Sequence, residues 1–357
     1  MFYEIPAFRL VGLLVALASG YLLLRLVHSR KISGFEFLFW FGAVSFVVTL
    51  SIYPQFNQTI FSYFSFTSNE RSDRLIGLAF IFIFLLSCIV FYYRNRLFTC
   101  EQQFLNTIQV TTANQFIHKH KEQLGESELF ILIPALNEEE NLKSVLEKIP
   151  TEICGLHPQV IVISDGSTDN TVGIAIRKGA EVVEHPINFG GGMALKTGYR
   201  IALAMGARYV VTLDADGQYQ PNEIERLLHP LIENKADMVS GSRVLGFFEQ
   251  NLDPSNIFRS VGVRIFNIIL TAITGQKITD SSSGFRAIKA EYLPHLTLIQ
   301  SQFHSSEFLI ESLKNGLKFQ EVPISFLKRI SGESKKPATW AYGIGFLRAM
   351  LKTWLRK

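Results

Sequence analysis

Short apolar runs alternate with helical segments between residues 129 and 240. The runs are Leu129–Ile133, Val160–Ile163, Ala180–Val183, Tyr209–Leu213 and Met238–Ser240, and the helical segments between them are Glu138–Ile149, Thr168–Lys178, Met193–Met205 and Pro221–Glu233. Alternation with this spacing is typical of a mostly parallel sheet that is covered by helices. The sequence therefore predicts an α/β domain, which we place at residues 128–336.

An acidic motif, Asp214-Ala215-Asp216-Gly217-Gln218, directly follows the apolar run Tyr209–Leu213. Ligands bind at the carboxyl ends of strands in sheets of this class. Two carboxylates and an amide supply three hard oxygen ligands, which suit Mg²⁺ or Mn²⁺ shared with substrate phosphates. A bare Asp-x-Asp is also compatible with an acidic turn whose side chains face solvent, so the neighbouring loops decide between the two.

Three other predicted strands also end in polar loops. These loops are residues 134–140, 164–171 and 188–196. We expect Pro134 to end its strand, Asn137 to cap the next helix, and Asp165 to accept hydrogen bonds from a base or ribose. Glycines at 190–192 precede a helix and would let backbone N–H groups approach a phosphate, although the loop is neither a P-loop nor Gly-x-Gly-x-x-Gly. Four such loops at one sheet edge predict combined recognition of base, phosphate and metal.

These motifs together resemble glycosyltransferase family 2, and most closely its polyprenyl-phosphate glycosyltransferases, such as dolichyl-phosphate mannose synthase and the bactoprenol glucosyltransferases. The resemblance covers roughly Leu129 to Lys336. It is carried by residues 134–138, 165–169, 191–192 with Lys196, 214–218, 241–243, 283–286 and 329–335. It implies a GT-A fold, which is Rossmann-like with a mostly parallel sheet, and a hexosyltransferase activity.

The resemblance also implies a role for each matching residue. The residues implied for nucleotide-sugar binding are Pro134, Leu136, Glu138, Asp165, Lys196 and Asp214, and those implied for the Mg²⁺ or Mn²⁺ cofactor are Asp214, Asp216 and Gln218. The residues implied for binding of acceptor or donor phosphate are Arg243, Arg259, Arg329 and Lys335. The residues implied for catalysis are Asp216, Arg243 and Arg329. Arginine suits phosphate because its planar fork binds two oxygens at once. Arg259 has no flanking motif and is equally compatible with a solvated surface charge.

The chain departs from the family pattern at two positions. Ser164 stands before Asp165 where the family often has an acid, which weakens any inference about the base. Val263 stands four residues after Arg259 where the family often has serine, so the acceptor-phosphate contacts are less defined than the metal site.

The implied reaction is an inverting transfer from a nucleotide-sugar of the GDP-mannose or UDP-glucose type to a polyprenyl phosphate, dolichyl or undecaprenyl. Such an acceptor is already ionised, whereas a hydroxyl acceptor usually needs a general base. Asp280 and Glu307 are candidates for that base, and a turn residue and a helix-surface acid are their simpler interpretations. Two alternatives stay open: transfer to a glycan or glycolipid hydroxyl, and a non-catalytic membrane scaffold with a degenerate domain. The net charge of +4 gives no reason to expect a nucleic acid partner.

The amino-terminal segment, residues 1–97, holds three apolar stretches at about 10–27, 35–53 and 75–93. The third has 19 uncharged residues, a helix of about 28 Å against a hydrocarbon core of about 30 Å. Basic residues lie at or just after the end of the first stretch (Arg25, Arg30, Lys31) and follow the third (Arg94, Arg96). The positive-inside rule then predicts an integral protein of the cell inner membrane, with its amino terminus outside and its catalytic domain cytoplasmic.

Three further segments complete the prediction. Residues 98–127 are expected to form a helical linker, and 337–357 a basic amphipathic tail on the membrane surface. The segment Phe258–Thr274 is compatible with an interfacial helix or a core helix. The three cysteines form no Cys-x-x-Cys pair, so neither a disulfide framework nor a zinc site is expected.

Overall fold

The computed structural model of the chain describes residues 20–21, 40–42, 44–45, 70–120, 127–249, 254–329, 331 and 340–356. The chain divides into two compact units, Met1–Leu97 and Phe98–Lys357. In parts of three helices the backbone is described without the side chains, and this includes residues 254–263.

Helix α4 runs from Glu70 to His120. The first two apolar stretches of the sequence fall almost entirely outside the described residues, and the third falls within α4, where side chains before residue 82 are not described. Of the helices searched in the described part of the chain, none combines the length and the apolar character that crossing a bilayer requires. The expected linker is helical as far as His120.

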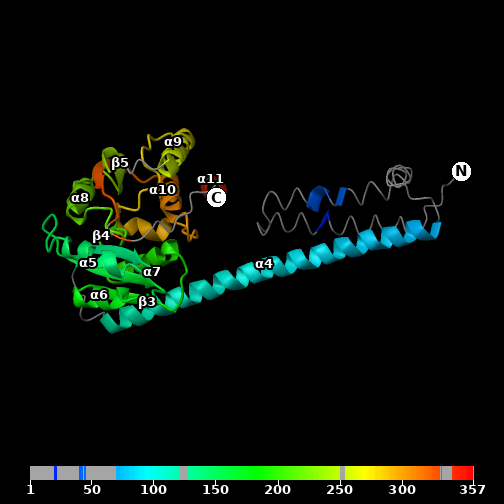
Figure 1. Ribbon diagram of the computed structural model, residues 1–357, viewed down its shortest axis with the longest axis horizontal. Coiled ribbons are helices and arrows are strands. Elements are labelled where there is room, and N and C mark those ends of the chain that lie inside the picture. The colour runs from blue at the N-terminus through cyan, green and yellow to red at the C-terminus, as the bar shows by residue number, and fades with distance from the viewer. Residues whose placement is uncertain are drawn as a thin grey trace. The chain divides into compact units, whose positions relative to one another are not determined.

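Seven strands among the described residues form one sheet (Figure 1). They are β1 (Leu129–Ala135), β2 (Pro158–Asp165), β3 (Glu181–His185), β4 (Tyr209–Thr212), β5 (Met238–Phe248), β6 (Arg286–Lys289) and β7 (Phe319–Phe326), in the order β3-β2-β1-β4-β6-β5-β7. Strand β6 runs antiparallel to both neighbours, and the other pairs are parallel. The predicted α/β fold with a mostly parallel sheet is confirmed.

Helices cover both faces of this sheet (Figure 1). One face carries α5 (Glu139–Glu147), α6 (Thr171–Arg177) and α8 (Ile224–Ile232), which follows the short helix η1 (Pro221–Glu223). The other face carries α7 (Gly191–Ala204), α9 (Pro254–Thr274), η2 (Ala290–His295), α10 (His304–Lys314), α11 (Trp340–Leu355) and the end of α4. Successive β1 side chains point to opposite faces: Phe130 packs with α7, and Ile131 with α5 and α8. Because both faces are buried, the strand reads as a continuous apolar run.

Pro134 lies inside β1 and does not end it, contrary to expectation. The ladder with β4 pairs β1 only from Leu129 to Leu132, so a missing N–H at position 134 interrupts no hydrogen bond on that side. Strands β6 and β7 were not predicted. Strand β6 is four residues long and charged at both ends, and β7 is an edge strand that contains Pro323, a position where proline is tolerated.

The carboxyl-terminal helix α11 packs against α10 within the second unit. Phe346 and Met350 are buried in the core on that face. Beyond the helix, Arg356 Nη2 donates to Glu307 Oε1 over 2.8 Å. The segment predicted as a surface tail is therefore a packed helix, and its contact with a membrane remains a prediction.

Candidate active site

The loops after β1 and β2 are joined by hydrogen bonds at the carboxyl edge of the sheet. Asn137 Oδ1 accepts from Thr168 N over 2.8 Å, so Asn137 does not cap α5 as expected. Glu139 N donates to Asp169 Oδ2 over 3.1 Å, and Glu138 N donates to the Thr171 hydroxyl over 2.9 Å. The two loops thus form a single wall.

Asp165 is buried at the end of β2, where its carboxylate is engaged by neighbouring residues of the same chain. Its Oδ1 contacts His185 Nδ1 at 2.8 Å and accepts from Phe189 N over 3.1 Å, while Oδ2 accepts from Gly190 N over 2.7 Å. The other ring nitrogen of His185 lies 2.9 Å from the Thr197 hydroxyl. Asp165 therefore fixes the start of the glycine-rich loop, and the proposed contact with a nucleotide stays a prediction.

The glycine-rich loop packs tightly against residues 299–301. Gly192 N donates to Ser301 O over 2.8 Å, and a Cβ on Gly192 would lie 2.7 Å from His304 Cβ and would clash with the Gln300 carbonyl. Glu307 Oε2 holds the facing segment by accepting from Ile299 N over 2.9 Å and from Gln300 N over 2.7 Å. Glycine is required at 192 because two backbones meet there.

The acidic loop after β4 contacts the chain that follows β7. Asp216 Oδ2 accepts from Arg329 Nη2 over 2.9 Å, and Asp216 Oδ1 accepts from Gln218 N over 3.2 Å. Gln218 Nε2 donates to Leu327 O over 3.2 Å, and Leu327 N donates to Gln218 O over 2.8 Å. These bonds bring the motif at 214–218 together with the arginine of the distant motif at 329–335.

Arg329 also approaches the wall formed by the first two loops. Its Nη1 lies 3.6 Å from Glu138 Oε1, and the opposite oxygen, Glu138 Oε2, accepts from Asn141 Nδ2 over 2.8 Å. Asn141 Oδ1 in turn accepts from Ser331 N over 3.1 Å. The side chain of Arg329 is 19% exposed, so it can still meet a ligand while it bridges Glu138 and Asp216.

Asp214 sits against Gly284, the glycine of the predicted Ser-Gly-Phe-Arg motif. A Cβ at Gly284 would lie 2.8 Å from Asp214 Oδ1, so any other residue would displace the carboxylate. Gly284 N donates to the Tyr219 hydroxyl over 2.9 Å, and Thr212 Oγ1 donates to Gly284 O over 2.7 Å. Burial raises the pKa of Tyr219 to about 12. Tyr219 therefore stays a neutral support for this loop.

The donor set of the acidic loop fits a hard divalent cation. Asp214, Asp216 and Gln218 offer carboxylate and amide oxygens from one short turn. An ionised carboxylate has about four lone-pair sites, so Asp216 can bind a cation in addition to its present partners. Because Gln218 Nε2 is held by Leu327 O, its Oε1 is the amide atom that can bind a metal. Oxygen ligands of this kind suit Mg²⁺ and Mn²⁺.

Arg243 is paired with Asp280. Arg243 Nε and Nη2 donate to the two oxygens of Asp280, each over 2.7 Å, and Nη2 also donates to the Ser282 hydroxyl. Burial opposes ionisation of both groups, but the opposite charge outweighs it: the pKa of Asp280 lies below its ordinary value and that of Arg243 above it. Arg243 is 21% exposed and can meet an anion at its open side.

The two candidate general bases are both engaged in structure. The side chains of Asp280 and Glu307 are each 1% exposed. Asp280 binds Arg243 through both oxygens, and Glu307 binds two backbone N–H groups and Arg356. Both carboxylates are thus already engaged by the protein's own groups in this structure.

For the remaining predicted site residues, the structure gives a position or a degree of burial, or the residue lies outside what is described. Burial, and then Arg200, lower the pKa of Lys196, which is partly buried in α7. Pro134 and Leu136 are half-buried at the end of β1. Arg259 lies in α9, but its side chain is outside the described set, and Lys335 lies outside the described residues altogether. Sequence reasoning missed Tyr219 and Asn141, whose supporting roles arise from contacts distant in sequence.

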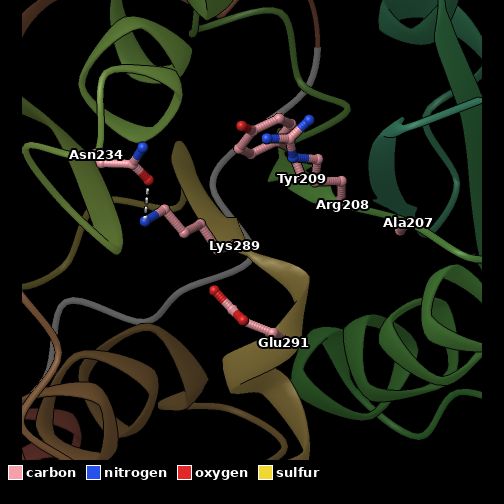
Figure 2. A pocket seen from close by; sticks show the side chains of 6 residues that line it. All are labelled: Ala207, Arg208, Tyr209, Asn234, Lys289 and Glu291. Carbon is pink, nitrogen blue, oxygen red and sulfur yellow. Dashed lines mark hydrogen bonds between the residues drawn. The ribbon is translucent and has the colours of Figure 1, made fainter.

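A pocket of about 420 Å³ lies elsewhere, at the amino end of β4 (Figure 2). It is lined by Ala207, Arg208, Tyr209, Asn234, Lys289 and Glu291. Lys289 already donates to Asn234 Oδ1 over 2.9 Å and to Asp237 Oδ1 over 3.0 Å, and Arg208 pairs with Glu128 at 3.2 Å. Because Tyr209 begins β4 and Asp214 follows its end, the pocket is at the other edge of the sheet from the predicted chemistry.

Comparison with known proteins places these loops in a family. The family model described as Glycosyl transferase family 2 matches residues 130–297. An undecaprenyl-phosphate mannosyltransferase of Micrococcus luteus is 31% identical over 57% of this chain and 85% of its own length. A UDP-N-acetylglucosamine–dolichyl-phosphate N-acetylglucosaminyltransferase of Methanococcus voltae is 31% identical over 56% of this chain and 86% of its own. A polyprenol monophosphomannose synthase of Mycolicibacterium smegmatis is 30% identical, with 57% and 79% covered.

The fold also matches that of solved structures. Glucosyl-3-phosphoglycerate synthase from Mycobacterium tuberculosis, in complex with Mn²⁺, uridine diphosphate and glucosyl-3-phosphoglycerate, has a TM-score of 0.52 and 21% sequence identity. The match covers 68% of this chain and 83% of that one. This likeness supports the expected GT-A-like sheet.

Proposed function

The chain belongs to glycosyltransferase family 2, and on this premise we propose that the enzyme transfers a sugar from a nucleotide-sugar to a polyprenyl phosphate. Two relatives at 31% identity are transferases named for dolichyl phosphate and undecaprenyl phosphate, and a third, at 30%, is a polyprenol monophosphomannose synthase. The match covers 79–86% of the length of those relatives. The donor sugar, of the GDP-mannose or UDP-glucose type, is part of the proposal.

The donor would bind at the joined loops after β1, β2 and β4. Pro134, Leu136 and Glu138 belong to the first loop, Asp165 binds Gly190 of the glycine-rich segment, and Lys196 lies in α7, which begins in that segment. Asp214, Asp216 and Gln218 would hold Mg²⁺ or Mn²⁺ at the donor diphosphate, where the ion would neutralise charge on the leaving group. Arg329, which already bridges Glu138 and Asp216, would stabilise the same charge through its fork.

The engagement of Asp280 and Glu307 favours a phosphate acceptor over a hydroxyl. A hydroxyl must lose its proton to a base during attack, whereas a lipid phosphate is ionised at neutral pH. Both candidate bases are 1% exposed and are held by arginine partners. An acceptor phosphate oxygen would attack the anomeric carbon while the bond to the diphosphate oxygen breaks, and this single displacement inverts the anomeric centre. Arg243, with Arg259 and Lys335 as further candidates, would bind the acceptor phosphate.

Exposed apolar side chains near Arg243 support a lipid acceptor. Val244, Leu245 and Phe247 follow Arg243 in β5 and are 63%, 49% and 60% exposed. The Ser242 hydroxyl lies 2.6 Å from that of Thr279, whose carbonyl accepts from Asn267 Nδ2 in α9. Ile268 in α9 is 68% exposed. These side chains suit the acyl boundary of a membrane. Residues 1–97 would anchor the enzyme in the inner membrane with its catalytic domain cytoplasmic.

The test is transfer by purified full-length protein with Mg²⁺ or Mn²⁺ and a panel of labelled nucleotide-sugars. Polyprenyl phosphate and free glycans would be offered in parallel. We expect label in the organic phase only when polyprenyl phosphate is present. Transfer only to glycans would overturn the proposal in favour of a hydroxyl acceptor.

A further inference from the structure

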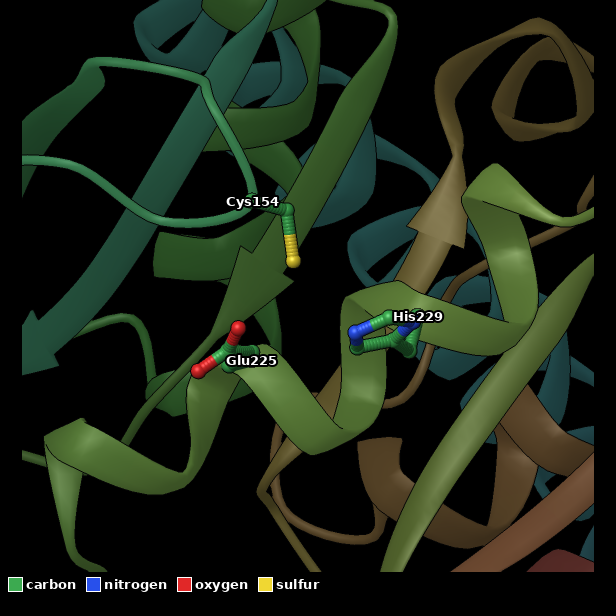
Figure 3. A group of neighbouring side chains, drawn as sticks. All are labelled: Cys154, Glu225 and His229. Atoms are coloured by element: carbon green, nitrogen blue, oxygen red, sulfur yellow. The ribbon is translucent and has the colours of Figure 1, made fainter.

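Three metal-ligating side chains meet outside the active site. The Cys154 sulfur, a carboxylate oxygen of Glu225 and a ring nitrogen of His229 all lie within 4.8 Å of one another. Figure 3 shows the Cys154 side chain extending from its loop toward the helix that carries the other two. Glu225 and His229 stand four residues apart on α8 and therefore share a face of that helix.

Cys154 is held in front of α8 by a tight turn before β2. Ile153 and Leu156 exchange two backbone hydrogen bonds of 2.9 Å each, and Ile153 is buried in the core. Cys154 itself has a φ of +51°, a left-handed conformation that is unfavourable for a residue with a side chain. The conformation costs free energy, but it aims the thiol at the helix.

The opposite face of α8 packs in the core through Leu227, Leu228 and Leu231. Glu225 and His229 are exposed and Cys154 is partly buried, so an ion can reach all three from solvent. His229 Nδ1 also lies 4.0 Å from Glu233 Oε1, and Glu233 is itself paired with Lys235 at 2.9 Å. The cluster is therefore accessible and has one side closed by the turn.

We propose that Cys154, Glu225 and His229 bind a zinc ion, with water in the fourth position. Sulfur, nitrogen and carboxylate donors are the ligands of tetrahedral Zn²⁺, at about 2.3, 2.0 and 2.1 Å. Ligands at those lengths stand roughly 3.5 Å apart, so the three ligand atoms, which lie within 4.8 Å of one another, need to close by at most about 1.3 Å. The thiolate separates this site from the all-oxygen set at 214–218, which suits Mg²⁺ or Mn²⁺.

The ion would tie the turn at 153–156 to α8. This helix directly follows η1, where Glu223 Oε2 accepts from Ser325 N in β7 over 2.7 Å. The site would thus join two segments that lie about 70 residues apart in sequence.

Cobalt binding to chelator-treated full-length protein tests the site, in buffer that holds excess Mg²⁺ to occupy the acidic loop. We expect one Co²⁺ per chain, a sulfur-to-cobalt charge-transfer band, and loss of the band on adding Zn²⁺. Cys154→Ser should abolish the band and His229→Gln should weaken binding at least about 10-fold. Cys100→Ser and Asp216→Ala should leave both unchanged, since these residues lie outside the cluster.

Zinc should also raise the melting temperature of the wild type and of Cys100→Ser, but not of Cys154→Ser. Circular dichroism of each variant would establish that it is folded. Absence of the charge-transfer band in the wild type would overturn the site. A band that survives Cys154→Ser but disappears in Cys100→Ser would overturn it as well.

Discussion

Arg329 Nη2 donates to Asp216 Oδ2 over 2.9 Å, although the two residues are separated by 113 positions in the chain. The same guanidinium lies 3.6 Å from Glu138, so one cation contacts both the loop after β1 and the loop after β4. These are the loops on which we place the nucleotide and its metal. The arrangement gives the arginine a fixed position before any substrate binds.

Replacing Arg329 by alanine should lower kcat for sugar transfer about 100- to 1,000-fold, because a preorganised donor to the leaving-group charge is lost. Lysine should restore only part of the rate, since a point charge cannot bridge Asp216 and Glu138 as a planar fork does. Initial-rate kinetics measure this. Lys328→Ala is the matched control, because Lys328 is the exposed neighbour. An Arg329→Ala rate equal to that of the control would contradict the assignment.

Asp280→Asn should destabilise the protein by about 2–4 kcal/mol at pH 7, because it leaves the largely buried Arg243 without its counter-charge; the value lies below that of a fully buried pair because Arg243 keeps an open side. Burial raises the pKa of Asp280, but the charge of Arg243 and its hydrogen bonds outweigh burial, so the pKa in the folded protein lies below its ordinary value. The contribution of Asp280 is therefore complete above the unfolded pKa of about 3.9 and is lost as the pH falls through the folded pKa.

Urea unfolding between about pH 5 and pH 2 should thus show a steeper acid loss of stability for the wild type than for Asp280→Asn. Glu291→Gln, which changes an exposed carboxylate, serves as control. Parallel pH profiles for wild type and Asp280→Asn would show that the pair contributes nothing to the acid dependence.

Gly192→Ala should destabilise the protein by about 1–3 kcal/mol through overpacking. Its new Cβ would lie 2.7 Å from His304 Cβ and against the Gln300 carbonyl. Gly191→Ala is the matched control, since a Cβ there meets nothing nearer than His304 Cε1 at 3.5 Å. Thermal unfolding of the two variants should separate them, and equal melting temperatures would refute the close approach.

The sequence was sufficient for the parts of the fold that local pattern determines. Strands β1, β2 and β4 contain apolar runs in a parallel sheet, where burial on both faces leaves a clear signal. Strand β6 has only four residues, and β7 alternates buried and exposed side chains around a proline at the sheet edge. Their place depends on pairing with distant strands, which local pattern does not encode.

The candidate active site shows the same difference between features that local sequence predicts and contacts that it does not. Asp214 and Asp216 could be located from their position after a strand, whereas the partner of each came from elsewhere in the chain. Arg243 was predicted as a phosphate ligand, and its bond to Asp280 was not. Cys154 gave no zinc signal because its companions, Glu225 and His229, lie about 70 residues away. Contacts between residues so far apart in sequence arise from tertiary packing, so they produce no motif of fixed spacing that the sequence alone could reveal.

The most direct measurement of the central claim compares two acceptors that differ only in the phosphate. Purified full-length protein would be given a labelled nucleotide-sugar and Mn²⁺ with either polyprenyl phosphate or the matching polyprenol. We predict glycolipid formation with the phosphate alone, and its loss in Asp216→Ala. Equal transfer to the polyprenol, or an Asp216→Ala rate equal to that of the wild type, would contradict a base-free, metal-assisted transfer to a lipid phosphate.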